Sequence, residues 1–255
     1  DGRLTPEELI AEAKKAGLHY IALTDHDTVD GISHLYESGL FPTKGIHIIP
    51  GIEFSAHHPL HEVHILGYGI DIFCTSLLDK LNEVTDARWS RFSEIVEKLN
   101  GLGYAITEAD VLAIAGVSKS ISRSHIGRVL VKKGYFDSVR SAFEELLSKG
   151  QPAYVPHYRL EVEEVLSLIL AAEGRAVLAH PKLVYDEELV ERICQMGIDG
   201  IEVFYPQHDE DDTAHYLELA KKYGLLPAGG SDFHGFSTRY PTEIGVFTIP
   251  DEYAV

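Results

Sequence analysis

Residues 20–27 read Tyr-Ile-Ala-Leu-Thr-Asp-His-Asp, an apolar run that ends in a polar tetrad. A β-branched and aromatic run bounded by polar residues is typical of a short buried strand. The tetrad Thr24-Asp25-His26-Asp27 therefore follows the carboxyl end of that strand, where α/β folds place their chemistry. We expect this stretch to supply the first part of a functional site.

The same arrangement, acidic or imidazole side chains after an apolar run, recurs three times. Glu53 follows the run at 46–50, His180 follows 176–178, and Asp232 and His234 follow 225–228. Helical and extended patterns alternate from 162 to 228, which predicts repeated βα units and a largely parallel sheet. Acid and imidazole groups delivered repeatedly to strand ends are what a multinuclear metal site needs.

The residue types favour particular metals. Imidazole and carboxylate together suit Mn, Fe or Zn, whereas sites made only of carboxylates favour Mg or Ca. Asp232 and His234 are two residues apart, so an extended segment places both on one side. His64 lies in the expected strand 63–67 and, taken alone, fits a packed core histidine. With Glu53 on the preceding strand, the interpretation as a metal ligand is favoured.

Composition limits the class of protein. The 255 residues are enough for one large α/β domain or a barrel with an insertion, and the formal net charge of −18 argues against stable DNA binding. No apolar run approaches the ~20 residues that span a bilayer. Asp1-Gly2-Arg3-Leu4 lacks the apolar region of a signal peptide, and Cys74 and Cys194 are isolated. We therefore expect a cytoplasmic protein.

The chain divides by pattern. Thr5, Pro6 and Glu8 predict a capped helix that ends near Gly17. Residues 76–149 show helical periodicity and almost no strand signal, so we expect a barrel-like domain over 1–75 and 150–255, interrupted by a helical insertion. Arg123 and His125 lie near a helix start in this insertion. They could bind a phosphate, although solvated basic residues at a helix start explain them equally well.

At this point the motifs resemble a known family, the PHP (polymerase and histidinol phosphatase) superfamily, in its branch of nucleotide phosphoesterases. The resemblance rests on segments in the family's order along nearly the full chain. They are Asp1-Gly2 with Thr5-Pro6-Glu7-Glu8, Ala22-Leu23-Thr24-Asp25-His26-Asp27, Pro50-Gly51-Ile52-Glu53, Glu62-Val63-His64-Ile65-Leu66-Gly67, Ala179-His180-Pro181 and Gly230-Ser231-Asp232-Phe233-His234.

The resemblance implies a distorted (β/α)7 barrel with a helical insertion and three divalent metal ions. By this likeness Glu53 bridges two ions, one of which also takes His64 and His180. The matched metal ligands are Asp1, His26, Glu53, His64, His180, Asp232 and His234, and His26, Glu53, Asp232 and His234 are the expected catalytic residues. Arg123 and His125 match the insertion's phosphate-binding pair.

The family's opening strand carries an Asp-Leu-His-x-His motif that is absent from this sequence, so we expect a sheet without its first strand. The implied activity is cleavage of a nucleotide phosphate ester by metal-activated hydroxide. The substrate would be a 3′,5′-bisphosphonucleotide that loses its 3′-phosphate, or a short oligoribonucleotide trimmed from its 5′ end. A histidinol phosphatase, a non-catalytic metal-binding module and an amidohydrolase-type enzyme are the alternatives.

Overall fold

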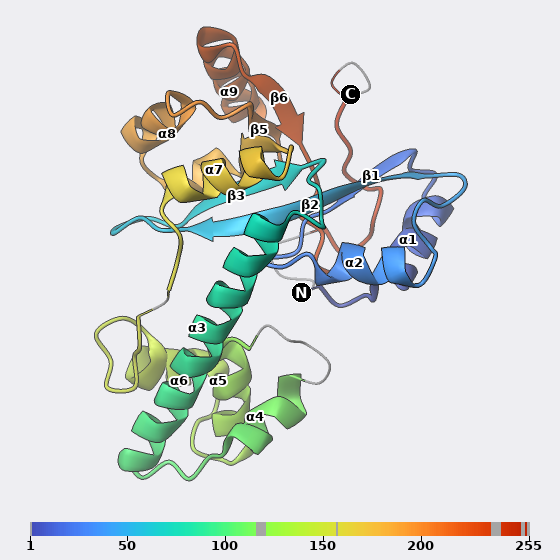
Figure 1. Ribbon diagram of the computed structural model, residues 1–255. Helices are drawn as coiled ribbons and strands as arrows, with labels where there is room; N and C mark the ends of the chain where they lie inside the picture. Colours follow the sequence, from blue (N-terminus) through green and yellow to red (C-terminus); the bar gives the residue numbers. More distant parts are fainter. Residues whose placement is uncertain (1, 116–120, 157, 236–240, 251–252, 254–255) are drawn as a thin grey trace. The chain divides into compact units, whose positions relative to one another are not determined.

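The computed structural model describes residues 2–115, 121–156, 158–235, 241–250 and 253 (Figure 1). The chain forms two compact units. Unit 1 contains residues 1–79 and 159–255, and unit 2 contains residues 80–158. Among the described residues, no helix is long and apolar enough to cross a membrane.

Unit 1 is built on one curved sheet of six strands, which lie side by side in chain order (Figure 1). The strands are β1 (Tyr20–Leu23), β2 (His47–Ala56), β3 (Val63–Tyr68), β4 (Arg175–Leu178), β5 (Gly200–Phe204) and β6 (Leu226–Gly229). The mixed α/β class expected from the sequence is therefore confirmed.

The strands of the sheet run in mixed directions. β3 runs antiparallel to both of its neighbours, while β1 with β2, β4 with β5 and β5 with β6 are parallel. A largely parallel sheet was expected from the alternation over 162–228, and the strands of that stretch, β4, β5 and β6, are parallel to one another. No direction was predicted for β3. Only residues 57–62 separate β2 from β3, which is too short for the crossover that a parallel neighbour needs.

Most helices of unit 1 lie where the sequence predicted them, within a few residues, whereas the helices Asp30–Glu37 and Pro181–Val184 were not predicted. Thr5 forms a complete capping box with Glu8 at the start of the first helix, and Gly17 follows its end with φ +78°. The elements are α1 (Pro6–Lys15), α2 (Asp30–Glu37), α7 (Val162–Ala171), the short 3₁₀ helix Pro181–Val184, α8 (Glu187–Cys194) and α9 (Glu210–Tyr223). α7 packs on β2, β3 and β4, and α9 packs on β5 and β6.

Unit 2 is helical in its described residues. Its elements are α3 (Thr75–Gly101), which begins in unit 1, α4 (Glu108–Ala115), α5 (Arg123–Lys132), α6 (Val139–Ala142) and the π-helical turn Phe143–Leu147. They surround an apolar core that includes Phe92, Leu99, Leu130 and Leu147, all at most 2% exposed. Burial of this core stabilises the unit by removing apolar surface from water.

Candidate metal centre

Strand β2 carries the central residue of the site in its middle. We expected Glu53 just beyond a strand at 46–50, but β2 continues to Ala56 and includes it. Side chains alternate along a strand, so Glu53 lies on the face opposite Ile52 and Phe54, which are at most 1% exposed. The apolar face supports the sheet, while the other face presents the carboxylate.

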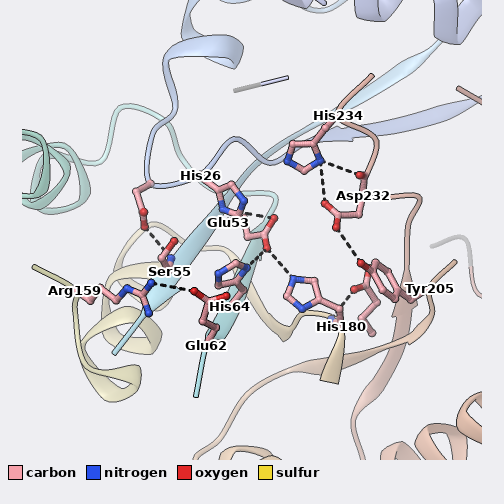
Figure 2. A network of polar contacts seen from close by, with 12 residues as sticks. His26, Glu53, Ser55, Glu62, His64, Arg159, His180, Tyr205, Asp232 and His234 are labelled. Carbon is pink, nitrogen blue, oxygen red and sulfur yellow. Dashed lines mark hydrogen bonds and ion pairs between the residues drawn. The ribbon is translucent and has the colours of Figure 1, made fainter. Parts of the chain in front are cut away.

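Three histidines from different elements surround this carboxylate (Figure 2). Glu53 Oε1 lies 2.8 Å from His64 Nδ1 and 3.1 Å from His180 Nε2, and Glu53 Oε2 lies 3.9 Å from His26 Nδ1. The ring of His64 lies 5.0 Å from the rings of both His26 and His180, between centroids. His26, Glu53 and His64 are close enough to share one metal ion.

The pKa values of two members of this cluster, Glu53 and His26, are shifted downward. Burial alone raises the pKa of Glu53, but the charge of His26 and hydrogen bonds with His180 and His64 hold that pKa well below its usual range. Burial lowers the pKa of His26, against the opposing charge of Glu53. An anionic carboxylate beside a neutral imidazole is ready to bind a divalent cation without first losing a proton.

Asp232 and His234 form the neighbouring part of the site. The ring of His234 lies 5.9 Å from that of His26, and His234 Nδ1 lies 3.3 Å from Asp232 Oδ1. The Tyr205 hydroxyl donates a hydrogen bond to Asp232 Oδ2 at 3.2 Å. Burial, followed by the charge of Glu53, raises the pKa of Asp232. A cation here would relieve this repulsion between carboxylates.

Asp1, the remaining predicted ligand, lies outside the described residues. The segment that follows it does reach the site. The Arg3 N–H donates a hydrogen bond to the His234 carbonyl at 2.9 Å.

The backbone at the site is strained. Asp27, His180 and Asp232 have φ of +52°, +28° and +49°, values that non-glycine residues rarely adopt. Such conformations persist only where the surrounding structure holds them, and they concentrate at functional sites.

Glu202 holds His180 in this conformation and was missed in the sequence. It is 4% exposed in β5, and its Oε2 accepts the backbone N–H of His180 at 2.7 Å. Burial raises the pKa of Glu202 well above its usual value, the His180 N–H opposes this shift, and the charges of Glu53 and Asp232 add to it. A carboxylate inside the predicted strand Gly-Ile-Glu-Val was the available signal, because an acidic residue is seldom fully buried.

Asp27 is a second missed residue, although it belongs to the quoted tetrad. It is 6% exposed, and its Oδ1 accepts the Ser55 N–H at 2.9 Å. The backbone of Glu53 also bonds this loop: its N–H donates to the Asp25 carbonyl at 3.1 Å, and its carbonyl accepts the Asp27 N–H at 2.9 Å. These contacts fix the position of His26 between them.

Arg123 and His125 lie at the start of α5 in unit 2. Arg123 Nη1 donates to the Leu147 carbonyl at 3.0 Å, and its guanidinium lies 5.4 Å from the Phe143 ring centroid. His125 Nδ1 accepts the Ser122 N–H at 3.1 Å, which caps the helix. Arg123 thus links the start of α5 to the end of the π-helical turn, and His125 caps α5.

Comparison with known proteins identifies the family of the chain. A sequence model described as the PHP domain matches residues 1–155. The chain belongs to the PHP domain family. The resemblance read from the motifs is confirmed, and with it the classification of the chain as a hydrolase of the metal-dependent phosphoesterase type.

Three curated relatives of this PHP protein are similar over most of their length. A 3′,5′-nucleoside bisphosphate phosphatase of Chromobacterium violaceum is 34% identical over 92% of this chain and 83% of its own. The 5′-3′ exoribonuclease Rnm of Escherichia coli is 32% identical over 92% of this chain and 81% of its own length. A phosphoribosyl 1,2-cyclic phosphate 1,2-diphosphodiesterase of Eggerthella lenta is 28% identical over 98% and 95%.

Two solved structures resemble the PHP protein. A protein of Bifidobacterium adolescentis, assigned as a metal-dependent phosphoesterase, has a TM-score of 0.81 and 28% identity, covering 100% of this chain and 90% of that one. An amidohydrolase of Chromobacterium violaceum, with bound sulfate and no metal, has a TM-score of 0.76 and 33% identity, covering 92% and 84%. These likenesses and the donor set around Glu53 support divalent metal ions as cofactors.

Proposed function

We propose that the protein hydrolyses a nucleotide phosphate ester at the face that carries Glu53. The preferred reaction is removal of the 3′-phosphate from a 3′,5′-bisphosphonucleotide, with trimming of short oligoribonucleotides from the 5′ end as a related activity. The names of the Chromobacterium and Escherichia relatives support this choice of substrates. The bound sulfate of the Chromobacterium structure supports an oxyanion as ligand.

The observation that carries the proposal is the buried carboxylate of Glu53 with His26, His64 and His180 around it. We propose three Mn, Fe or Zn ions per site. The proposed ligands are Asp1, His26, Glu53, His64, His180, Asp232 and His234. When bound, such ions supply an activated water and offset the negative charge on the phosphate oxygens.

The residues of the chain would have distinct roles. Glu53 contributes the fixed negative charge that draws cations together, and the imidazoles hold them as neutral ligands. Tyr205 would keep the Asp232 carboxylate oriented through its hydroxyl hydrogen bond. The β2–β3 pair holds Glu53 and His64 on rigid backbone, so little reorganisation is needed during the reaction.

Arg123 and His125 are proposed to bind the phosphate of the substrate that does not react. Arg123→Ala should then raise KM for a bisphosphonucleotide about tenfold or more, since a charge-assisted hydrogen bond contributes about 1.5–3 kcal/mol. KM for a plain aryl phosphate should change little, because this substrate has no second phosphate. Arg140→Ala, an exposed residue of the same unit, is the matched control. Equal losses on both substrates would reject the assignment.

The experiment that tests the function is hydrolysis of 3′,5′-bisphosphoadenosine by the purified protein supplemented with Mn. We expect AMP and one free phosphate, and weaker turnover of histidinol phosphate, which has a single phosphate. Preferential turnover of histidinol phosphate would favour the histidinol phosphatase alternative. Bound metal without turnover of any ester would favour a non-catalytic module.

A cyclic phosphate diester is the second candidate substrate. The Eggerthella relative, whose name states a cyclic phosphate substrate, matches 98% of this chain and 95% of its own length. A five-membered cyclic phosphate of ribose should therefore be assayed alongside the bisphosphonucleotide.

We further propose four finer features of the protein. They are the distorted (β/α)7 barrel over 1–75 and 150–255, the insertion over 76–149, the absence of stable DNA binding and the cytoplasmic location.

A further inference from the structure

One arginine lies on the same face of the sheet as the candidate metal centre. Arg159 belongs to the segment that leads into α7, and this segment continues the sheet beyond β2. His57 and Glu161 form a parallel bridge, and the His57 N–H donates to the Leu160 carbonyl at 2.6 Å. In a parallel pair the register is kept along both strands. Counting back two residues from His57 and from Glu161 therefore places Arg159 beside Ser55.

The register then fixes which face Arg159 occupies. Ser55 is two residues from Glu53 on β2, so their side chains share one face. Ser55 is also the cross-strand partner of His64. Figure 2 shows the Arg159 side chain beside Ser55, Glu62 and His64, on the side of the centre away from Asp232.

The guanidinium of Arg159 is incompletely satisfied. Its Nη2 lies 3.6 Å from Glu62 Oε1, and the side chains are 22% and 74% exposed respectively. Its Nε is buried and makes no hydrogen bond within the described residues. By contrast, Arg175 at the start of β4 is 69% exposed and bonds Asp199 at 3.0 Å, as a surface pair does. A buried donor without an acceptor is costly, so Arg159 suits an acceptor that arrives with a ligand.

The charge around Arg159 favours an anionic ligand at this position. The buried acidic residues of this face include Asp27 and Glu53, and the pKa of Glu53 is held well below its usual range by the charge of His26 and by hydrogen bonds. These carboxylates would repel a phosphate that approached without a compensating cation. A guanidinium presents two parallel N–H donors that match two phosphate oxygens, which a lysine cannot do.

We propose that Arg159, with the adjacent Ser55 hydroxyl, forms an oxyanion subsite that binds a phosphate group of the substrate beside His64. Glu62 holds the guanidinium in position until the phosphate takes the place of the Glu62 carboxylate. The inference rests on the proposed function, because it names a further contact of the same site. It concerns phosphate binding and does not depend on which nucleotide carries the phosphate.

The test is binding of inorganic phosphate to the Mn-loaded protein by isothermal titration calorimetry, with metal content measured in parallel. Arg159→Gln should weaken phosphate binding about 10- to 100-fold, the range for a lost charge-assisted hydrogen bond. Metal content should not change, because Arg159 offers no metal-binding atom. Arg159→Lys should recover part of the affinity, and Arg175→Gln is the matched control, expected to bind as the wild type does.

Glu62→Gln provides a second route if Arg159→Gln fails to fold. It removes the competing carboxylate without touching the arginine, so phosphate should bind several-fold more tightly. Unchanged phosphate affinity in Arg159→Gln, or in Glu62→Gln where only that variant folds, would overturn the proposal. So would absence of phosphate binding by the wild type. If phosphate binds through Arg159 but no nucleotide is turned over, the subsite stands and the proposed substrate is rejected.

Discussion

The two compact units bury different kinds of side chain. In unit 1 the buried polar residues of the described chain, Asp27, Glu53, His180 and Glu202, gather on one face of the sheet. The core of unit 2 contains only apolar residues in its described part, among them Leu99 and Leu130. Among the described residues, the fully buried acidic and imidazole side chains therefore all lie in unit 1, which carries the candidate metal centre.

The cost of this arrangement is visible in unit 1. Buried carboxylates and imidazoles lose hydration, and left-handed backbone at His180 and Asp232 adds strain of about 1–3 kcal/mol per residue. A stability-optimised sheet would place apolar residues there. The polar face is explained by the metal ions it is suited to bind.

The largest expected effect comes from the carboxylate at the centre of unit 1. Glu53→Gln should abolish stable metal binding and lower kcat/KM about 10³-fold, since the ions supply several kcal/mol of stabilisation. Metal content per chain and the rate of ester hydrolysis measure both effects. Glu191→Gln, a surface residue paired with Lys222, is the control. Full metal content with a rate within tenfold of wild type would contradict the central role of Glu53.

A core substitution in unit 2 should lower the stability of the fold and leave metal binding intact. Leu130→Ala removes a fully buried side chain and should lower the free energy of unfolding by about 2–5 kcal/mol, without changing metal content. Trp89, the single tryptophan of the chain, lies in unit 2 and reports its urea unfolding by fluorescence. Leu112→Ala, at 37% exposure, is the control with a small expected change. Loss of metal together with stability would break the separation of the two units.

Glu202 tests whether the site depends on its supporting residues. Glu202→Ala removes the acceptor of the His180 N–H and should weaken metal affinity about 10- to 100-fold, the range for residues that orient ligands. Glu202→Gln keeps an oxygen acceptor and should recover most of the affinity. Competition with a fluorescent chelator measures both variants. If Gln were no better than Ala, the charge of Glu202 would matter and its hydrogen bond would not.

The smallest expected effect is a change with pH in the unfolding free energy of unit 2. Burial, and then the charge of Arg128, lower the pKa of His125 below its ordinary 6.5, and its neutral Nδ1 accepts the Ser122 N–H. The stabilisation is therefore complete above pH 6.5 and is lost as pH falls through the lowered folded-state pKa, because protonation removes the acceptor.

A capping interaction contributes about 1 kcal/mol, so the change in unfolding free energy between pH 7.5 and 5 should not exceed about this value. Trp89 fluorescence in urea measures it, with His125→Asn as the comparison. If the unfolding free energy changed with pH by the same amount in His125→Asn, groups other than His125 would be responsible for the change.

Local patterns predicted much of unit 1 because their physics is local. The Thr5–Glu8 capping box and the strand after His19 involve neighbours within a few residues. The strand expected at 46–50 was too short, because β2 continues to Ala56. The direction of β3 was not predicted, because it depends on how β3 pairs with β2 and β4 in the folded sheet. Glu202 was missed because its partner lies 22 residues away in the chain.

The sequence by itself determined the family, the positions of most elements and most of the candidate acidic and imidazole residues, since each is written in short motifs. Only the tertiary structure decided which of them meet. His180 and Glu53 are 127 residues apart, and their contact requires the order of strands, the antiparallel β3 and the strained turn after β4. The same is true of Arg159 and Ser55, which the bridge from His57 to Glu161 aligns. Such contacts depend on the packing of distant segments, which no local pattern of residues encodes.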